Sequence, residues 1–244
     1  MLLPEFLDRY FSCGIMKILK FKFMKEKFFE GADFKNKYFK ALIPIYYPPD
    51  YRRYIKEETV LLKRKIKGSN KILEAGVGIG RLIPELAPLV KKFIGIDVAD
   101  LMLKQSRKIS KKYKNVKIIK LNIEDAPNKF ARNYFDYSLC VWNTLGNIKS
   151  EENVLKQLAK ITAKSIFITV YKKGTLKKRK NWYKTVGVKI KKIDKRKEIF
   201  YSESGLKSKS YNLNDIKKIA SRAKLKIADY KILNGVIFWI ELTK

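Results

Sequence analysis

The chain has 244 residues, 46% of them hydrophobic and 32% charged, which is enough apolar material to bury one sizeable domain. Lys and Arg number 56 against 23 Asp and Glu, and the net charge of +33 suits nucleic acid, an anionic membrane surface or an acidic substrate. The sequence contains no His, which excludes a Ser-His-Asp triad, a His-ligated zinc and an imidazole base.

Cysteine usage and hydropathy predict a cytoplasmic protein. The two cysteines, Cys13 and Cys140, are too few and too far apart for a disulfide framework or a Cys-only metal site, so a reducing compartment and no metal are expected. No apolar run approaches the roughly 18 residues that cross a bilayer, so no membrane span is expected. Glu5, Asp8 and Arg9 interrupt the layout of a signal peptide.

Residues 1–49 are predicted to form a helical flank or lid on the main domain. Leu7, Phe11 and Ile15 recur at helical spacing, and the basic-aromatic stretch of residues 20–25 follows them. A basic amphipathic helix resting on a membrane surface is the alternative.

Residues 50–244 are predicted to form the main domain, beginning with a helix from Asp50 to about Lys67 that buries Ile55, Leu62 and Ile66. Short apolar runs then alternate with amphipathic stretches. Strands are expected at 71–75, 93–96, 116–121, 135–142 and 165–171, and helices at 81–89, 101–113 and 151–162. Alternation at this spacing indicates a parallel sheet that helices cover on both faces.

The C-terminal part of the sequence predicts antiparallel strands. A strand of a hairpin is expected at 198–202, and a helix at about 214–223. The last two apolar runs, at 225–233 and 235–242, are a turn apart, which is typical of a hairpin closing the sheet edge.

Positive charge is concentrated in residues 172–197, which hold thirteen Lys or Arg and one acid, a net +12 where an even spread would give about +3.5. We interpret residues 172–211 as a basic insert on the substrate side. It is either a solvated, lysine-rich hairpin or a surface for RNA, with Trp182 or Tyr183 stacking on a base. The basic residues predicted to hold phosphates in the RNA interpretation are Lys172, Lys173, Lys177, Lys178, Arg179 and Lys180.

The most specific motif is the segment Glu74-Ala75-Gly76-Val77-Gly78-Ile79-Gly80, between a predicted strand and helix. Gly76, Gly78 and Gly80 let the backbone turn sharply and approach a ligand, although tight packing alone also explains such glycines. A P-loop would need Gly-Lys-Ser or Gly-Lys-Thr, and a dinucleotide loop would need glycine where the chain has Arg81. Asp97, 23 residues after Glu74, provides a second acid at the end of the next strand.

With these motifs, residues 50–171 resemble the class I S-adenosylmethionine-dependent methyltransferases. The resemblance implies a Rossmann-like, doubly wound and mostly parallel sheet of seven strands, with an antiparallel final hairpin. It implies S-adenosyl-L-methionine as the cofactor, with Glu74 facing the cationic methionine end. Asp97 is expected to accept hydrogen bonds from both ribose hydroxyls, as one carboxylate can.

The same resemblance implies residues around the adenine. Val98 and Met102 match positions that flank this base in the family. In the stretch after the third strand, Asn122 stands where the family usually has an acid that meets the adenine amino group, and Ile123 and Glu124 follow it. An amide oxygen can still accept from that amino group.

The segment of residues 135–147, which ends in Asn-Thr-Leu-Gly-Asn, resembles the fourth motif of small-molecule N- or O-methylating members. The expected activity is in-line transfer of a methyl group to an N or O nucleophile of a small molecule, with Asn143 and Tyr171 orienting that substrate. Packing under the insert is the alternative for Tyr171. An RNA methyltransferase, or a non-catalytic protein that binds the cofactor or RNA, remain alternative functions, and the oligomeric state is not predicted.

Overall fold

The computed structural model describes residues 46–244. The flank or lid predicted for residues 1–49 therefore lies almost wholly outside the described residues, as does Cys13. Within residues 46–244, no helix has both the length and the apolar character needed to cross a membrane.

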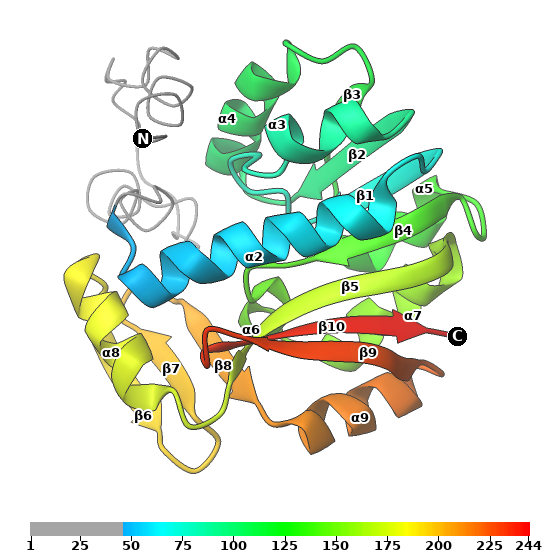
Figure 1. Cartoon of the computed structure of the whole chain (residues 1–244). Coiled ribbons are helices and arrows are strands. Elements are labelled where there is room, and N and C mark those ends of the chain that lie inside the picture. The colour runs from blue at the N-terminus through cyan, green and yellow to red at the C-terminus, as the bar shows by residue number, and fades with distance from the viewer. Residues whose placement is uncertain (1–45) are drawn as a thin grey trace.

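The core of the fold is a twisted sheet with the strand order β3-β2-β1-β4-β5-β10-β9 (Figure 1). The first five of these strands are parallel, whereas β10 is antiparallel to both β5 and β9. The bounds are β1 (Lys71–Ala75), β2 (Lys92–Asp97), β3 (Val116–Lys120), β4 (Phe135–Cys140), β5 (Thr162–Lys172), β9 (Lys226–Leu233) and β10 (Ile237–Thr243). The prediction of a Rossmann-like, mostly parallel seven-stranded sheet with an antiparallel final hairpin is confirmed.

Helices cover both faces of this sheet (Figure 1). Alternate residues of β5 enter separate hydrophobic cores: Phe167 packs on the side of α2 (Pro49–Ile66), and Ile166 and Ile168 on the other side. The remaining helical segments of this body are α3 (Ile83–Leu86), η4 (Ala87–Leu89), α4 (Asp100–Ser110), η5 (Ile123–Asp125), α5 (Ala126–Lys129), α6 (Thr144–Asn147), α7 (Glu151–Ile161) and α9 (Leu213–Arg222). The helix expected at 81–89 breaks into α3 and η4, and Pro88, which has no N–H to continue the helical ladder, lies at the break.

Helix α2 lies along the sheet and reaches the carboxyl ends of its strands (Figure 1). Its predicted stripe of Ile55, Leu62 and Ile66 is buried, as expected, and so is the charged side chain of Glu58. Asp50 is in the first turn but is not the N-cap, because the helix begins one residue earlier after Pro48. The buried face of α2 thus brings a carboxylate to the edge of the sheet where the parallel strands end.

The lysine-rich region folds into α8 (Leu176–Thr185), β6 (Ile190–Asp194), β7 (Ile199–Ser202) and β8 (Lys207–Tyr211). Strand β8 extends the sheet beyond β5 through the pairs Tyr171–Ser210 and Lys172–Tyr211, which gives a sheet of ten strands within residues 46–244. The helix α8 was not expected from the sequence. It forms because Arg179, Trp182 and Tyr183 lie three and four residues apart and share one buried face.

Candidate functional site

The glycine loop follows β1 and folds back onto β2. The backbone N–H groups of Gly76 and Val77 both donate to the carbonyl of Ile96, at 2.9 and 3.0 Å. Gly76 has a φ of +80°, and a Cβ at this position would lie 2.7 Å from Cγ2 of Thr144, the first residue of α6. The absent side chain therefore lets the loop pack directly against the end of β4.

The next two glycines of the loop have different roles. Gly78 has a φ of +53°, and no described atom lies within 4 Å of the place where its Cβ would be, so its backbone faces open space. A Cβ on Gly80 would lie 2.7 Å from Cδ1 of Ile83 and 3.1 Å from Cβ of Ser106. Gly78 is thus available to a ligand, whereas the missing side chain of Gly80 serves packing of the loop on α3 and α4.

Asp97, at the end of β2, holds the backbone of the site. Its Oδ2 accepts from Gly78 N at 2.8 Å, and its Oδ1 accepts from Val98 N at 2.8 Å and Ala99 N at 3.0 Å. Burial raises the pKa of this carboxyl, and the three backbone N–H groups oppose that effect. A carboxylate has about four acceptor positions, so one is left on Oδ2. Asp97 can accept hydrogen bonds from both ribose hydroxyls only if one backbone donor, such as Gly78 N–H, no longer bonds to its carboxylate.

Glu74 is a central residue of the sheet, paired with Gly95 on β2 and Leu139 on β4. Its side chain is 3% exposed, and Oε2 has no hydrogen-bond partner among the described residues. Burial raises the pKa of Glu74 to about 8, with Arg81 opposing the rise and Asp97 adding to it. A buried carboxylate oxygen without a partner is costly, and a cationic ligand group would satisfy it.

A buried ion pair joins α2 to the glycine loop. Glu58 is fully buried; its Oε2 accepts from the Arg81 guanidinium and its Oε1 from Thr169 Oγ1 at 2.7 Å. Thr169 Oγ1 in turn accepts from Trp142 N at 2.8 Å, and Tyr54 OH donates to Glu58 at 3.2 Å. Glu58 therefore fixes the residue after Gly80 and the backbone at the end of β4 together. Glu58 is not predictable as a site residue, because nothing in its local sequence marks a buried charge.

The predicted adenine residues lie at the ends of β2 and β3, which are joined by a hydrogen bond from Leu121 N to Asp97 O at 3.0 Å. Val98 is 44% exposed, whereas Met102, which belongs to α4, is buried in the hydrophobic core. Asn122 is exposed, and its Oδ1 accepts from Glu124 N at 3.1 Å as the cap of η5. The side chain of Ile123 is buried and that of Glu124 half-buried.

The two predicted substrate-side residues come together beyond β4 and β5. Asn143 is 2% exposed, and its Oδ1 accepts from Tyr171 N at 3.1 Å. Its amide nitrogen lies 3.3 Å from Ser208 Oγ and 3.4 Å from Asn147 Oδ1. The carboxamide of Asn143 is therefore used within the protein, to tie β4 to β5 and to β8.

Aromatic side chains surround this end of the sheet. Trp142 stacks on Tyr47 and Tyr54, with ring centroids 5.1 and 5.5 Å apart, and Trp182 stacks on Tyr51 at 5.3 Å. Tyr51 OH is buried without a hydrogen-bond partner among the described residues. The beginning of α2 and the helix α8 thus meet over the carboxyl ends of β4 and β5.

The basic insert does not present all the residues that the RNA interpretation required. Arg179, Trp182 and Tyr183 are 0%, 2% and 6% exposed, so none of them presents its side chain at the surface, where a phosphate or a base of RNA would meet it. Lys178 pairs with Asp50 at 2.7 Å and Lys173 with Asp215 at 2.9 Å. Lys177 and Lys180 are exposed, and Lys172 is half-buried.

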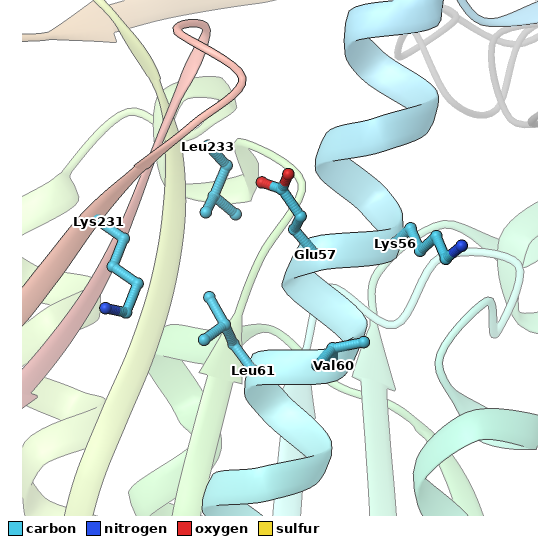
Figure 2. A pocket seen from close by; sticks show the side chains of 6 residues that line it. All are labelled: Lys56, Glu57, Val60, Leu61, Lys231 and Leu233. Carbon is cyan, nitrogen blue, oxygen red and sulfur yellow. The ribbon is translucent and has the colours of Figure 1, made fainter.

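A hollow of about 350 Å³ lies between α2 and β9, where Leu61 and Leu233 face each other (Figure 2). Its lining residues are Lys56, Glu57, Val60, Leu61, Lys231 and Leu233. None of the predicted site residues lines it, so it is separate from the glycine loop.

The site fits a nucleoside that carries a positive charge. The unpartnered oxygen of Glu74 suits an ammonium group, and Gly78 leaves room for the sugar beside the remaining acceptor position of Asp97.

Comparisons with known proteins agree with this geometry. A family model described as "Methyltransferase domain" matches residues 72–165. No curated protein matches the sequence. Similar solved structures are numerous, and those named below share less than 25% identity, so they bear on the fold.

The CcbJ methyltransferase of Streptomyces caelestis is 14% identical, with a TM-score of 0.65 over 91% of this chain and 99% of its own. The 1,6-didemethyltoxoflavin-N1-methyltransferase of Burkholderia thailandensis, solved with bound 1,6-didemethyltoxoflavin and S-adenosylhomocysteine, is 11% identical, with a TM-score of 0.61 over 87% of this chain and 85% of its own. A SAM-dependent methyltransferase of Aquifex aeolicus is 17% identical, with a TM-score of 0.58 over 80% and 93% of the two chains.

Proposed function

We propose that this chain, which carries a methyltransferase domain and has the class I methyltransferase fold, moves the methyl group of S-adenosylmethionine to an N or O nucleophile of a small molecule. The family match confirms the resemblance stated from the sequence. The observation that carries the proposal is the unpartnered, buried oxygen of Glu74 beside a glycine loop that is open at Gly78.

Four of the predicted cofactor-binding residues have a stated task in this proposal. Glu74 binds the ammonium group of the methionine end, and Asp97 accepts from the ribose. The exposed side chain of Val98 covers one face of the adenine, and Asn122 meets its amino group. When bound, S-adenosylmethionine supplies the methyl group on a sulfonium, which is already an excellent leaving group.

The acceptor is held beyond the ends of β4 and β5, where open parallel sheets bind ligands. Burial raises the pKa of Tyr171 well above its ordinary value, so its hydroxyl stays protonated and acts as a hydrogen-bond donor to the acceptor. Asn143 accepts from the backbone of Tyr171, so we assign it as a positioning residue. Holding the nucleophile about 3 Å from the methyl carbon, in line with the breaking bond, lowers the entropic part of the barrier.

A small acceptor is favoured over RNA because the insert buries the side chains that would stack on bases. Trp182 packs on Tyr51, and the Tyr183 hydroxyl donates to Ser208. In this proposal residues 172–211 close the acceptor side instead of forming a nucleic-acid surface.

The proposal is tested by following a labelled methyl group. The full-length protein is incubated with methyl-labelled S-adenosylmethionine and either a small-molecule extract or total RNA. We expect label in the small-molecule fraction and much less from an Asp97→Ala control at a limiting concentration of the cofactor. Label that accumulates in RNA, or no transfer by the wild-type protein to either pool, would contradict the proposal.

A further inference from the structure

One charged side chain in the insert is buried without an opposite charge. Arg179 is 0% exposed, and no described carboxylate lies within ion-pair distance of it. Its Nη1 donates to the backbone oxygen of Glu198 at 3.1 Å, and its Nη2 to the backbone oxygen and Oγ of Ser208 at 2.6 and 3.0 Å. Nε has no partner among residues 46–244. The guanidinium therefore meets only neutral oxygens.

The acid whose backbone Arg179 contacts uses its own carboxylate for other bonds. The Glu198 carboxylate accepts from Gly174 N at 2.9 Å through Oε1 and from Ser210 Oγ at 2.9 Å through Oε2. Two aromatic rings lie against the guanidinium, those of Tyr171 and Phe200, with its central carbon 4.7 and 4.8 Å from their centroids. Cation–π contacts offset only part of the cost of burying a charge, which is large unless the charge is paired.

A second unsatisfied donor lies in the same aromatic cluster. Tyr51 is 1% exposed, and its hydroxyl has no partner within the described part of the chain. Its ring lies 6.1 Å from that of Tyr171, the ring on which Arg179 rests. Burial keeps the Tyr51 hydroxyl protonated by raising its pKa, although Arg179 opposes this, so the hydroxyl is a donor at neutral pH. Two hydrogen-bond donors, one of them positively charged, thus lack acceptors.

We infer that Arg179 and Tyr51 bind an anionic group, of the carboxylate type, on the methyl acceptor. The inference rests on the proposed function, and it specifies that the methyl acceptor is negatively charged. Tyr171, at the end of β5, places this anion site next to the expected position of the nucleophile. A carboxylate there would accept hydrogen bonds from the free Nε–H of Arg179 and from the hydroxyl of Tyr51, so that both donors would be satisfied.

Because both donors are closed off from solvent, the acceptor enters only when α8 and the beginning of α2 separate. Two kinds of contact hold these elements together. Lys178 and Asp50 form an ion pair at 2.7 Å with the lysine 52% exposed, and Tyr51 stacks on Trp182. An exposed ion pair contributes little to stability, so the buried stacking of Tyr51 on Trp182 is the main contact that this opening must break.

The test compares two probes of the same shape, benzoate and benzamide. Each is titrated by calorimetry, at about 150 mM salt to suppress general attraction to a chain of net charge +33, into the free protein and into protein saturated with S-adenosylhomocysteine. We expect the Kd of benzoate to be at least tenfold lower than that of benzamide. Arg179→Met should abolish the difference, and Arg196→Met, which removes an exposed arginine of the same insert, should keep it.

Tyr51→Phe gives a second variant that retains the ring stacking and so should fold. It should weaken benzoate severalfold and leave benzamide unchanged. Equal affinities for the two probes, or no binding of either, would overturn the inference, as would an unchanged preference in Arg179→Met. Absence of S-adenosylhomocysteine binding would instead count against the proposed function. The titrations of the free protein would still show whether Arg179 and Tyr51 bind an anionic group.

Discussion

Replacing Glu74 by Gln is expected to stabilise the free protein and to weaken its binding of the cofactor. The side chain is buried in the centre of the sheet, and burial raises its pKa to about 8. Gln has almost the same shape but cannot ionise, so the variant isolates the charge. The two effects have opposite signs because the same carboxylate is costly in the free protein and useful against a cation.

The magnitude for stability follows from the two pKa values, about 8 in the folded chain and 4.5 as the ordinary value. Between these pH values the folded state keeps a proton that the unfolded state has lost. The free energy of unfolding therefore falls as pH rises through this window, by about 1.4 kcal/mol per pH unit and about 5 kcal/mol in all. Glu74→Gln should escape this loss, so its advantage over the wild type is largest at about pH 9.

The magnitude for binding follows from the protonation of Glu74. At pH 7 a carboxyl with a pKa of about 8 is mostly protonated, so binding an ammonium group should release most of one proton. Calorimetry with S-adenosylhomocysteine in two buffers of different ionisation enthalpy measures this release. Glu74→Gln should release none and should bind at least tenfold more weakly, through loss of a charged hydrogen bond.

Glu203→Gln, which neutralises an exposed acid, is the matched control and should change neither quantity. An unchanged Kd in Glu74→Gln, together with no proton release by the wild type, would refute the assignment of Glu74 to the cationic end of the cofactor.

Three further predictions follow from the loop and its supports. Gly78→Ala should fold with a strain of about 1–2 kcal/mol and lose S-adenosylhomocysteine binding in calorimetry. Gly80→Ala should lower the free energy of unfolding, measured with denaturant, by roughly a further 1–3 kcal/mol because its Cβ would clash. Equal stability of the two variants would contradict this prediction. Glu58→Gln should lose about 3–5 kcal/mol by leaving Arg81 unpaired, and adding Arg81→Met should restore much of it; additive losses would refute the pairing. Asp97→Ala should weaken the cofactor about 10- to 150-fold, from roughly 1.5–3 kcal/mol of charged hydrogen bonding, and an unchanged Kd would show that Asp97 serves the loop backbone alone.

The strands of the sheet and the glycine loop could be predicted because their signals are local. Five apolar runs alternate with amphipathic stretches, and the last two runs are separated by Asn234-Gly235. The loop between Glu74 and Arg81 is marked by glycines that only a sharp turn or a close approach requires. The local spacing of apolar residues and glycines was therefore enough to predict most of the strands and the glycine loop.

Long-range pairing was not predictable in the same way. Glu58 and Arg81 are separated by a helix and a strand, and only the packing of α2 brings them together. The sequence around Arg179 and Trp182 is so rich in lysine that it predicts an exposed hairpin, yet helical spacing puts both side chains on the buried face of α8. Their burial depends on α2, β5 and β8, none of which the local sequence specifies.

The number of hydrogen bonds that Asp97 can still accept from a ligand was also not predictable from the sequence. Its carboxylate was expected to serve two ribose hydroxyls, but three backbone N–H groups compete for the same oxygens. These backbone donors can be identified only from the folded conformation of the loop between β1 and α3.

The account is tested most directly by a crystal structure of the full-length protein with S-adenosylhomocysteine. We expect the amino group within about 3 Å of Glu74 Oε2, a ribose hydroxyl at a similar distance from Asp97 Oδ2, and the sulfur facing Tyr171. A nucleoside bound away from Gly78, or an amino group that leaves Glu74 unpartnered, would contradict the account.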